Sequence, residues 1–352
     1  MKLDELIRDP IFQLNLLLWM ARDQPEAAAR VQPLFHRWGY HFLMVETPVP
    51  LPPALVSAIT ASGLAITVNP EPEMILGHAT RRDALYLEAK RESFSSESST
   101  AKQARGHLLA AGAAFKEVVT PYERALLCYV LPEERRTLME TCLTELRQQL
   151  DAHQLGAAEA TVFGLEATSA GVNFIWAGEF AAWVGSDARR ALILKTEGED
   201  TDPSPLLLVY TAEDYSGERP DYAREAVLKQ LWAQLLCEIH LGEVGAELVL
   251  SVKADVLLTK TTDGIFNYLG RERQKSLCRL VTERLFQPIR EHWRPSEAER
   301  DDLRVALNGS VLTVTLRDEL AKRTFTDWLE DTKKVRLDFT SLPREEQTGF
   351  GF

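Results

Sequence analysis

The sequence predicts an α/β (α+β) protein with two domains, the first of them a mixed sheet flanked by helices. A chain of 352 residues is long enough for about two domains of ordinary size. Short apolar segments of strand length alternate with helical segments up to about residue 168, where the composition changes. We therefore expect an N-terminal helical segment at 1–45, a first α+β domain at 46–168 and a second α+β domain at 169–352.

The composition limits the class of protein. Hydrophobic residues make up 45% of the chain, which excludes wholesale disorder. The net charge of −12 is the opposite of what a protein that coats nucleic acid carries, so contact with nucleic acid would need a local basic patch. The charged start of the chain, its lack of a long apolar run and its four cysteines without a C-x-x-C pair together predict a cytoplasmic protein that does not enter a membrane.

The N-terminal third is predicted to be mainly helical. Helical patterns at 3–22 and 25–38 precede a short apolar segment, 41–45, that has the length of a strand. A proline-rich loop then leads to a short helix at 54–61, which Gly63 ends.

The next hundred residues carry the clearest pattern. Residues 84–90 alternate, with Leu85 and Leu87 on one face and Tyr86 and Glu88 on the other, which is the period of a β-strand. Further strands are expected at 64–68, 74–76, 125–131 and 160–165, and helices at 101–115 and 133–153.

The second half reads as a further mixture of strands and helices. We expect strands at 171–176, 191–195, 206–210, 248–258, 312–316 and 335–339, and helices at 222–241, 265–292 and 318–332.

Three charged residues suggest a chemical site. Glu73 precedes one expected strand, and Glu88 and Lys90 share a face of the next, so a hairpin between them would bring Glu73 close to Glu88. Two adjacent carboxylates repel each other, and a hard cation such as Mg²⁺ or Mn²⁺ removes the conflict. Lys90 would then lie beside the attacking water. The pattern predicts metal-assisted hydrolysis of a phosphodiester, with Glu73 and Glu88 as metal ligands.

These residues resemble a known family. Pro72-Glu73-Met-Ile-Leu, followed by Leu-Tyr-Leu-Glu88-Ala-Lys90, looks like the motif of the PD-(D/E)xK, or restriction-endonuclease-like, nuclease superfamily. The order helix, three strands, helix, strand is similar to the core of that fold. Many members carry Q-x-x-x-Y on the next helix, and here Gln103 stands in that place with His107 where tyrosine is usual. The resemblance covers about residues 50–168.

The resemblance implies a magnesium-dependent endonuclease that acts on DNA, with Glu73, Glu88, Lys90 and Gln103 as its catalytic residues. By analogy of fold, it also suggests an effector of prokaryotic antiphage defence. Members of the family often have a further acid on the first helix. Residues 54–61 have none, so that acid is missing or comes from another segment. Glu46 and Glu26 are the alternatives for it, and Glu71 is an alternative to Glu73 as ligand.

A second interpretation remains open. The same fold without activity would serve as a binding or scaffold subunit of a larger complex, and Glu88 with Lys90 would then form a surface ion pair. Residues 169–352 would bind a protein partner or nucleic acid, or form a homo-oligomer. Alanine at Glu88 and Lys90 separates the two interpretations, because a scaffold does not need them.

Overall fold

The structure is a computed structural model that describes residues 1–24, 29–112, 115–196, 198, 200–208, 222–243, 247–293 and 302–331, without the side chains of 222–225. The described residues form two compact units, both α+β as predicted. Unit 1 comprises Met1–Leu206 and Tyr268–Gly270, and unit 2 comprises Leu207–Asn267 and Arg271–Phe352.

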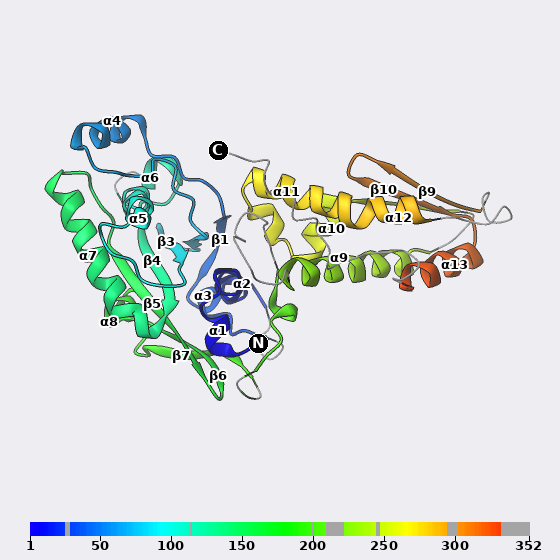
Figure 1. The fold of residues 1–352 in the computed structure, drawn as a ribbon, viewed down its shortest axis with the longest axis horizontal. Coiled ribbons are helices and arrows are strands. Elements are labelled where there is room, and N and C mark those ends of the chain that lie inside the picture. The colour runs from blue at the N-terminus through cyan, green and yellow to red at the C-terminus, as the bar shows by residue number, and fades with distance from the viewer. Residues whose placement is uncertain are drawn as a thin grey trace. The chain divides into compact units, whose positions relative to one another are not determined.

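A seven-stranded sheet forms the centre of unit 1, with its strands side by side in chain order (Figure 1). The three middle strands, β3 to β5, run parallel, and every other neighbouring pair is antiparallel. The strands are β1 (Tyr40–Val45), β2 (Met74–His78), β3 (Asp83–Ala89), β4 (Arg124–Pro132), β5 (Ala160–Thr168), β6 (Gly171–Ile175) and β7 (Arg190–Lys195).

The first strand of the sheet is β1, and the expectation of a strand at 64–68 is wrong. The backbone N–H of Thr67 donates to the carbonyl of Lys102, and the carbonyl of Val68 accepts from the N–H of Leu51. These bonds join the segment to a helix and a loop instead of to a strand. The three antiparallel strands are therefore β1, β2 and β3, with α4 (Pro53–Ser62) between β1 and β2, and the helices before them are α2 (Pro10–Ala21) and α3 (Leu34–Arg37).

The sheet also continues past the boundary that we placed near residue 168. That residue ends β5, and β6 pairs with β5 from Gly171 to Ile175. Because β7 then pairs with β6, the structure divides the chain near Leu206 instead.

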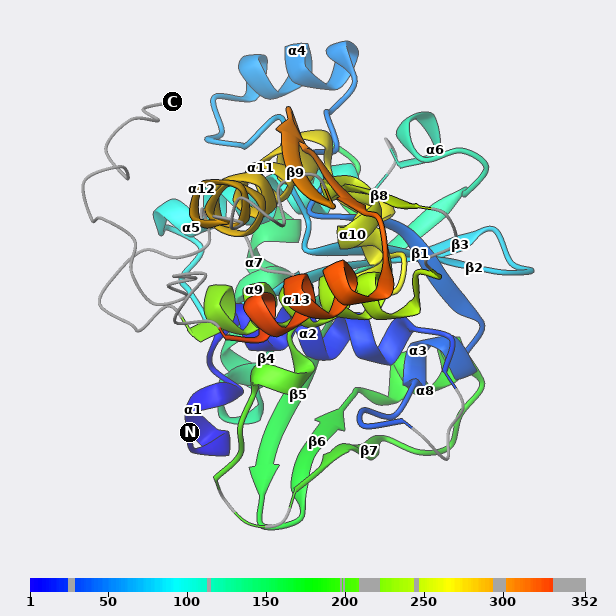
Figure 2. The same ribbon diagram turned by 90° about the vertical axis from the view of Figure 1, so that its right-hand side faces the viewer.

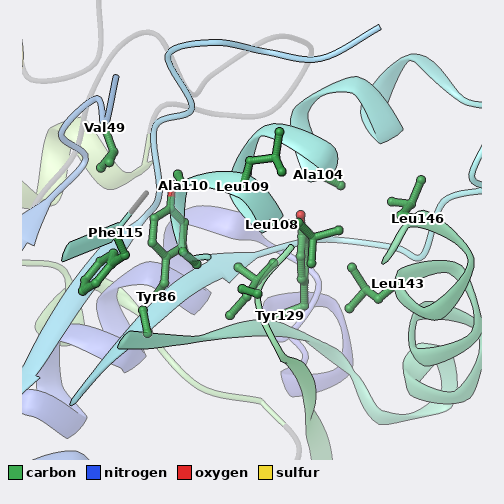
Figure 3. Packing of buried hydrophobic residues seen from close by; sticks show 14 of the residues in the cluster. Val49, Tyr86, Ala104, Leu108, Leu109, Ala110, Phe115, Tyr129, Leu143 and Leu146 are labelled. Carbon is green, nitrogen blue, oxygen red and sulfur yellow. The ribbon is translucent and has the colours of Figure 1, made fainter. Parts of the chain in front are cut away.

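Helices cover both faces of this sheet (Figure 1). Helix α2 is apolar around most of its circumference and is therefore buried, as expected for such a helix. Proline at its first position, with Asp9 as its N-cap, fixes where it begins. The opposite face packs against α5 (Ser99–Ala110) and α7 (Arg136–Ala152), whose leucines lie against Tyr86 and Tyr129 of the sheet (Figure 3).

Shorter helices complete unit 1. The expected helix at 3–22 is split, because α1 ends at Leu6 and α2 begins at Pro10. The expected helix at 25–38 is described only from residue 29, and there it is reduced to α3. The short helices are α1 (Leu3–Leu6), α3 (Leu34–Arg37), α4 (Pro53–Ser62), α6 (Phe115–Val118) and α8 (Gly178–Val184).

Unit 2 has a three-stranded antiparallel sheet in the order β8-β10-β9. The predicted helix at 222–241 is confirmed as α9, which lies beside α13 (Figure 2). The predicted strand at 248–258 ends early, at Lys253. The strand expected at 335–339 lies outside the described residues, and so do residues 209 and 210 of the strand expected at 206–210. The elements are α9 (Tyr222–Leu241), β8 (Leu248–Lys253), α10 (Ala254–Thr261), α11 (Arg271–Val281), α12 (Gln287–His292), β9 (Leu303–Asn308), β10 (Val311–Leu316) and α13 (Glu319–Glu330).

A hydrogen-bonded cluster fixes the turn between β2 and β3. The Tyr40 hydroxyl accepts from Trp183 Nε1 at 2.7 Å and from Arg81 Nη2 at 2.9 Å, and donates to the buried Asp83 at 3.3 Å. In the turn itself, His78 Nδ1 accepts from the backbone N–H groups of Thr80 at 3.2 Å and Arg81 at 3.1 Å. The turn therefore requires an unprotonated Nδ1 at His78.

The stability of unit 1 should fall as His78 becomes protonated. Burial, followed by the charge of Arg81, lowers the pKa of His78 in the folded protein. The unfolded chain then takes up a proton first, so this contribution to stability is present above the ordinary histidine pKa and declines below it. In His78→Asn the amide oxygen still accepts hydrogen bonds from the turn. We expect the melting temperature of this variant to fall less than that of the wild type between pH 7 and about pH 5. Identical pH profiles for the variant and the wild type would contradict this.

Candidate active site

The site is centred on Glu88 near the end of β3. All seven residues of β3 are buried, so the polar face expected for this strand is not solvated but lies under α5. Glu88 is only 2% exposed. Its Oε1 is 2.7 Å from Lys90 Nζ, and its Oε2 is 3.5 Å from His107 Nε2, slightly beyond a good hydrogen bond. The carboxylate therefore faces a possible cation on each side.

Helix α5 supplies the other side of the site. Gln103 and His107 are four residues apart and so share one face of the helix. Gln103 Oε1 accepts from Lys90 Nζ at 3.3 Å, and His107 Nδ1 is 2.9 Å from the hydroxyl of Tyr86. The structure thus brings together three of the four predicted catalytic residues, Glu88, Lys90 and Gln103, and adds His107 to them.

The electrostatic balance keeps Glu88 ionised. Burial by itself would raise the pKa of this carboxyl, but the charges of His107 and Lys90 and their hydrogen bonds outweigh it and hold the pKa below its ordinary value. Burial, together with the charge of Glu88, raises the pKa of Tyr86 and of Tyr129 well above that of a free phenol. The carboxylate of Glu88 therefore lies beside two phenols that stay neutral.

Glu73 lies beside Glu88 in the register of the sheet. The last ladder pair is Met74 with Leu87, so one further step along the two chains leads to Glu73 and Glu88. The backbone continues this row toward β1, because the carbonyl of Glu73 accepts from the N–H of Glu46 at 3.0 Å. Three acids thus follow one another across the ends of β1, β2 and β3.

The alternative ligands have different positions. Glu46 is 3% exposed and has a positive φ of 42°, at the point where the chain leaves β1. The negative charge of Glu71 contributes to the raised pKa of Tyr86, so Glu71 lies near the hydroxyl of Tyr86. Both remain alternatives, whereas Glu26 lies outside the described residues.

Gln13 of α2 is a residue of the site that the sequence analysis missed. Its side chain is fully buried, and its Nε2 donates to the carbonyls of Ile7 at 2.6 Å and Lys90 at 3.1 Å. Its Oε1 has no hydrogen-bond partner among the described residues. A polar residue within an otherwise apolar helix was the available signal.

The oxygen donors of the site suit a hard cation. Mg²⁺ in proteins usually takes one or two carboxylates and completes its shell with water and substrate phosphate. Glu73 and Glu88 provide two carboxylates, and Glu88 Oε2 is a buried oxygen without a hydrogen-bond partner among the described residues. Within the same residues, no group of three or more His, Cys, Asp or Glu side chains is arranged to hold a metal.

Comparisons with known proteins add no assignment to this geometry. No family model, no curated protein and no solved structure matches the chain.

The hydrogen bond between Tyr86 and His107 should contribute measurably to stability. Tyr86→Phe leaves Nδ1 of a fully buried histidine without its partner, and we expect a loss of about 1–3 kcal/mol in the free energy of unfolding. Tyr129→Phe is the matched control, because that buried hydroxyl has no hydrogen-bond partner among the described residues. Its removal should be neutral or stabilising. Denaturant titration distinguishes the two, and equal losses would contradict the assignment.

Proposed function

We propose that the protein is a metal-dependent nuclease that hydrolyses phosphodiester bonds in DNA, with Mg²⁺ or Mn²⁺ held by Glu73 and Glu88. The observation that best supports this is the contact of Lys90 Nζ with both Glu88 and Gln103 at the end of β3. An ammonium held at two points has a fixed direction, which a surface ion pair does not give. With α3, α4 and α6 inserted among them, α2, the strands β1 to β3, α5 and β4 have the element order of the nuclease superfamily that the motif resembles.

Each residue has a defined task in this proposal. Glu88 is ionised without a full shell of water, so its oxygens are available to a cation. Lys90 orients the attacking water and offsets the charge that develops on the phosphate. Gln103 and Glu88 keep the ammonium in place, and His107 limits the movement of Glu88. A bound divalent cation supplies the remaining positive charge and lowers the pKa of water.

The biological setting is a further part of the proposal. The resemblance extends by analogy of fold to effector nucleases of prokaryotic antiphage defence, and we propose that role for this protein in the cytoplasm. None of the described helices has the length and apolar character needed to cross a membrane.

An inactive scaffold subunit is the second candidate. It is favoured by the enclosure of Glu88, which is 2% exposed and already paired with Lys90. A protein that uses this fold only for assembly would keep such a pair as a structural element.

Cleavage of supercoiled plasmid tests the first candidate. We expect nicking or linearisation with Mg²⁺ or Mn²⁺, none in excess EDTA, and none with Glu88→Gln, which keeps the shape of the side chain without its charge. Lys90→Met should lower the rate by about 10²–10³-fold, the usual effect of losing one positioned electrostatic group. Glu97→Gln is the control, because Glu97 is an exposed acid on the loop before α5.

Stability must be measured beside activity. Lys90 faces a buried carboxylate, so its loss is expected to lower the melting temperature as well, and rates are to be compared well below that temperature. Cleavage that persists in EDTA, or at the wild-type rate in Glu88→Gln, would contradict the metal site at Glu88. No cleavage under any of these conditions would leave the scaffold.

A further inference from the structure

The order of elements in unit 2 is informative. The long helix α9 is followed by β8, then by the two helices α10 and α11, and then by the hairpin of β9 and β10. The hairpin pairs with β8 through β10, and α10 packs against both α9 and α11. Two consecutive packed helices on a small sheet have the order of a helix-turn-helix motif, with the nine residues 262–270 in place of its usual short turn. In that motif the second helix is the one that enters the major groove of DNA.

The connection between the two helices is suited to a sharp change of direction. Asp263 and Gly264 follow α10 directly and have positive φ values of 51° and 85°. The backbone N–H of Gly264 donates to the carbonyl of Thr259, which ends α10, and a 3₁₀ turn at Ile265–Tyr268 leads on to α11.

The second helix is basic within an acidic protein. From Arg271 to Val281 the sequence has four Lys and Arg against one Glu, whereas the whole chain has 40 basic and 52 acidic residues. Arg271, Lys275 and Arg279 are exposed and recur every four residues, which places them on one face of α11. The core is contacted by Leu277 and Val281 on another face.

The ion pairs on this face do not neutralise it. Lys275 pairs with Glu272 at 2.7 Å and Arg279 pairs with Glu283 at 2.6 Å, but the two cations are 71% and 63% exposed. Exposed pairs of this kind contribute little free energy, so a phosphate can replace the glutamate at small cost.

The sheet of unit 2, like α11, has more basic than acidic residues. None of the 18 residues of β8, β9 and β10 is acidic, and Lys253 and Arg304 are exposed on it. Across its middle, Thr313 pairs with Ser251 on one side and with Ala306 on the other. Small and hydroxyl side chains without carboxylates allow a sugar–phosphate backbone to approach and to accept hydrogen bonds.

We propose that unit 2 binds double-helical DNA, with the exposed cationic face of α11 in the major groove and the β9–β10 hairpin against the backbone. This inference deepens the proposed function, on which it rests for the choice of DNA. The occupant is a duplex because a helix fits the major groove of B-form DNA, whereas that groove is too deep and narrow in A-form RNA.

The test is binding of the full-length protein to a short fluorescent DNA duplex of mixed sequence, measured by anisotropy in EDTA so that no cleavage occurs. The triple variant Arg271→Ala/Lys275→Ala/Arg279→Ala should bind at least about tenfold more weakly. The slope of the logarithm of the binding constant against the logarithm of the salt concentration should become less steep by about three. The variant Arg271→Lys/Lys275→Arg/Arg279→Lys keeps the charges and should keep most of the affinity. Lys116→Ala/Arg190→Ala/Lys195→Ala removes as many exposed charges from unit 1 and should have little effect.

The outcomes separate this inference from the proposed function. If the wild type binds duplex through α11 but never cuts, the nuclease proposal fails and the inference stands. Wild-type affinity in the α11 alanine variant, an equal loss in the unit 1 control, or tighter binding of RNA duplex or single strands would overturn the inference.

Discussion

The site depends on keeping one carboxylate ionised in the interior. Removing the charge of Glu88 from water costs several kcal/mol, and the cost is offset only if partners of opposite charge come with good geometry. Lys90 provides one, because its position two residues further on places it on the same face of the chain. His107 of α5 provides the other partner, and the hydroxyl of Tyr86 is within hydrogen-bond distance of Nδ1 of the His107 ring. The packing of α5 on β3 is therefore tied to the charge of Glu88.

The same contacts fix the end of β3 from both faces of the sheet. On one face, the ammonium of Lys90 lies between Glu88 and Gln103. On the other, Gln13 of α2 donates to the carbonyl of Lys90, and the Lys90 N–H donates to Val130 of β4. A residue held at its side chain, its carbonyl and its amide has little freedom left. Such preorganisation is what an electrostatic catalyst requires, because the group must already point at the developing charge.

The sequence was informative where the signal is local. The alternation in β3 and the spacing of Gln103 and His107 depend on residues that are close in the sequence, and in the structure both helix residues lie at the Glu88–Lys90 pair. The pairing of β1 with β2 was not predictable in this way, because the helix α4 lies between them in the chain. The apolar segment 64–68 matched a strand equally well in composition, and only its backbone bonds to α5 and to a loop exclude it. Gln13 was missed for the same reason, since the approach of α2 to Lys90 is a tertiary contact.

The buried polar residues bear on the choice between enzyme and scaffold. Gln13, Glu88 and His107 are each at most 2% exposed, and they lie within one small region beneath α5 and beside α2. A structural module usually gains or loses little stability when a buried ion pair is replaced by apolar side chains of similar volume. Some buried polar groups specify a unique packing, and the Tyr40–Asp83 cluster at the other end of β3 fits that role, because its hydroxyl has three hydrogen-bonding partners. The region around Glu88 resembles that cluster, because Glu88 Oε2 faces His107 Nε2 at 3.5 Å and Gln13 Nε2 donates to two backbone carbonyls. Each end of β3 therefore holds a buried acid beside cationic side chains, Arg81 for Asp83 and Lys90 for Glu88, and this pairing offsets the cost of burying each acid.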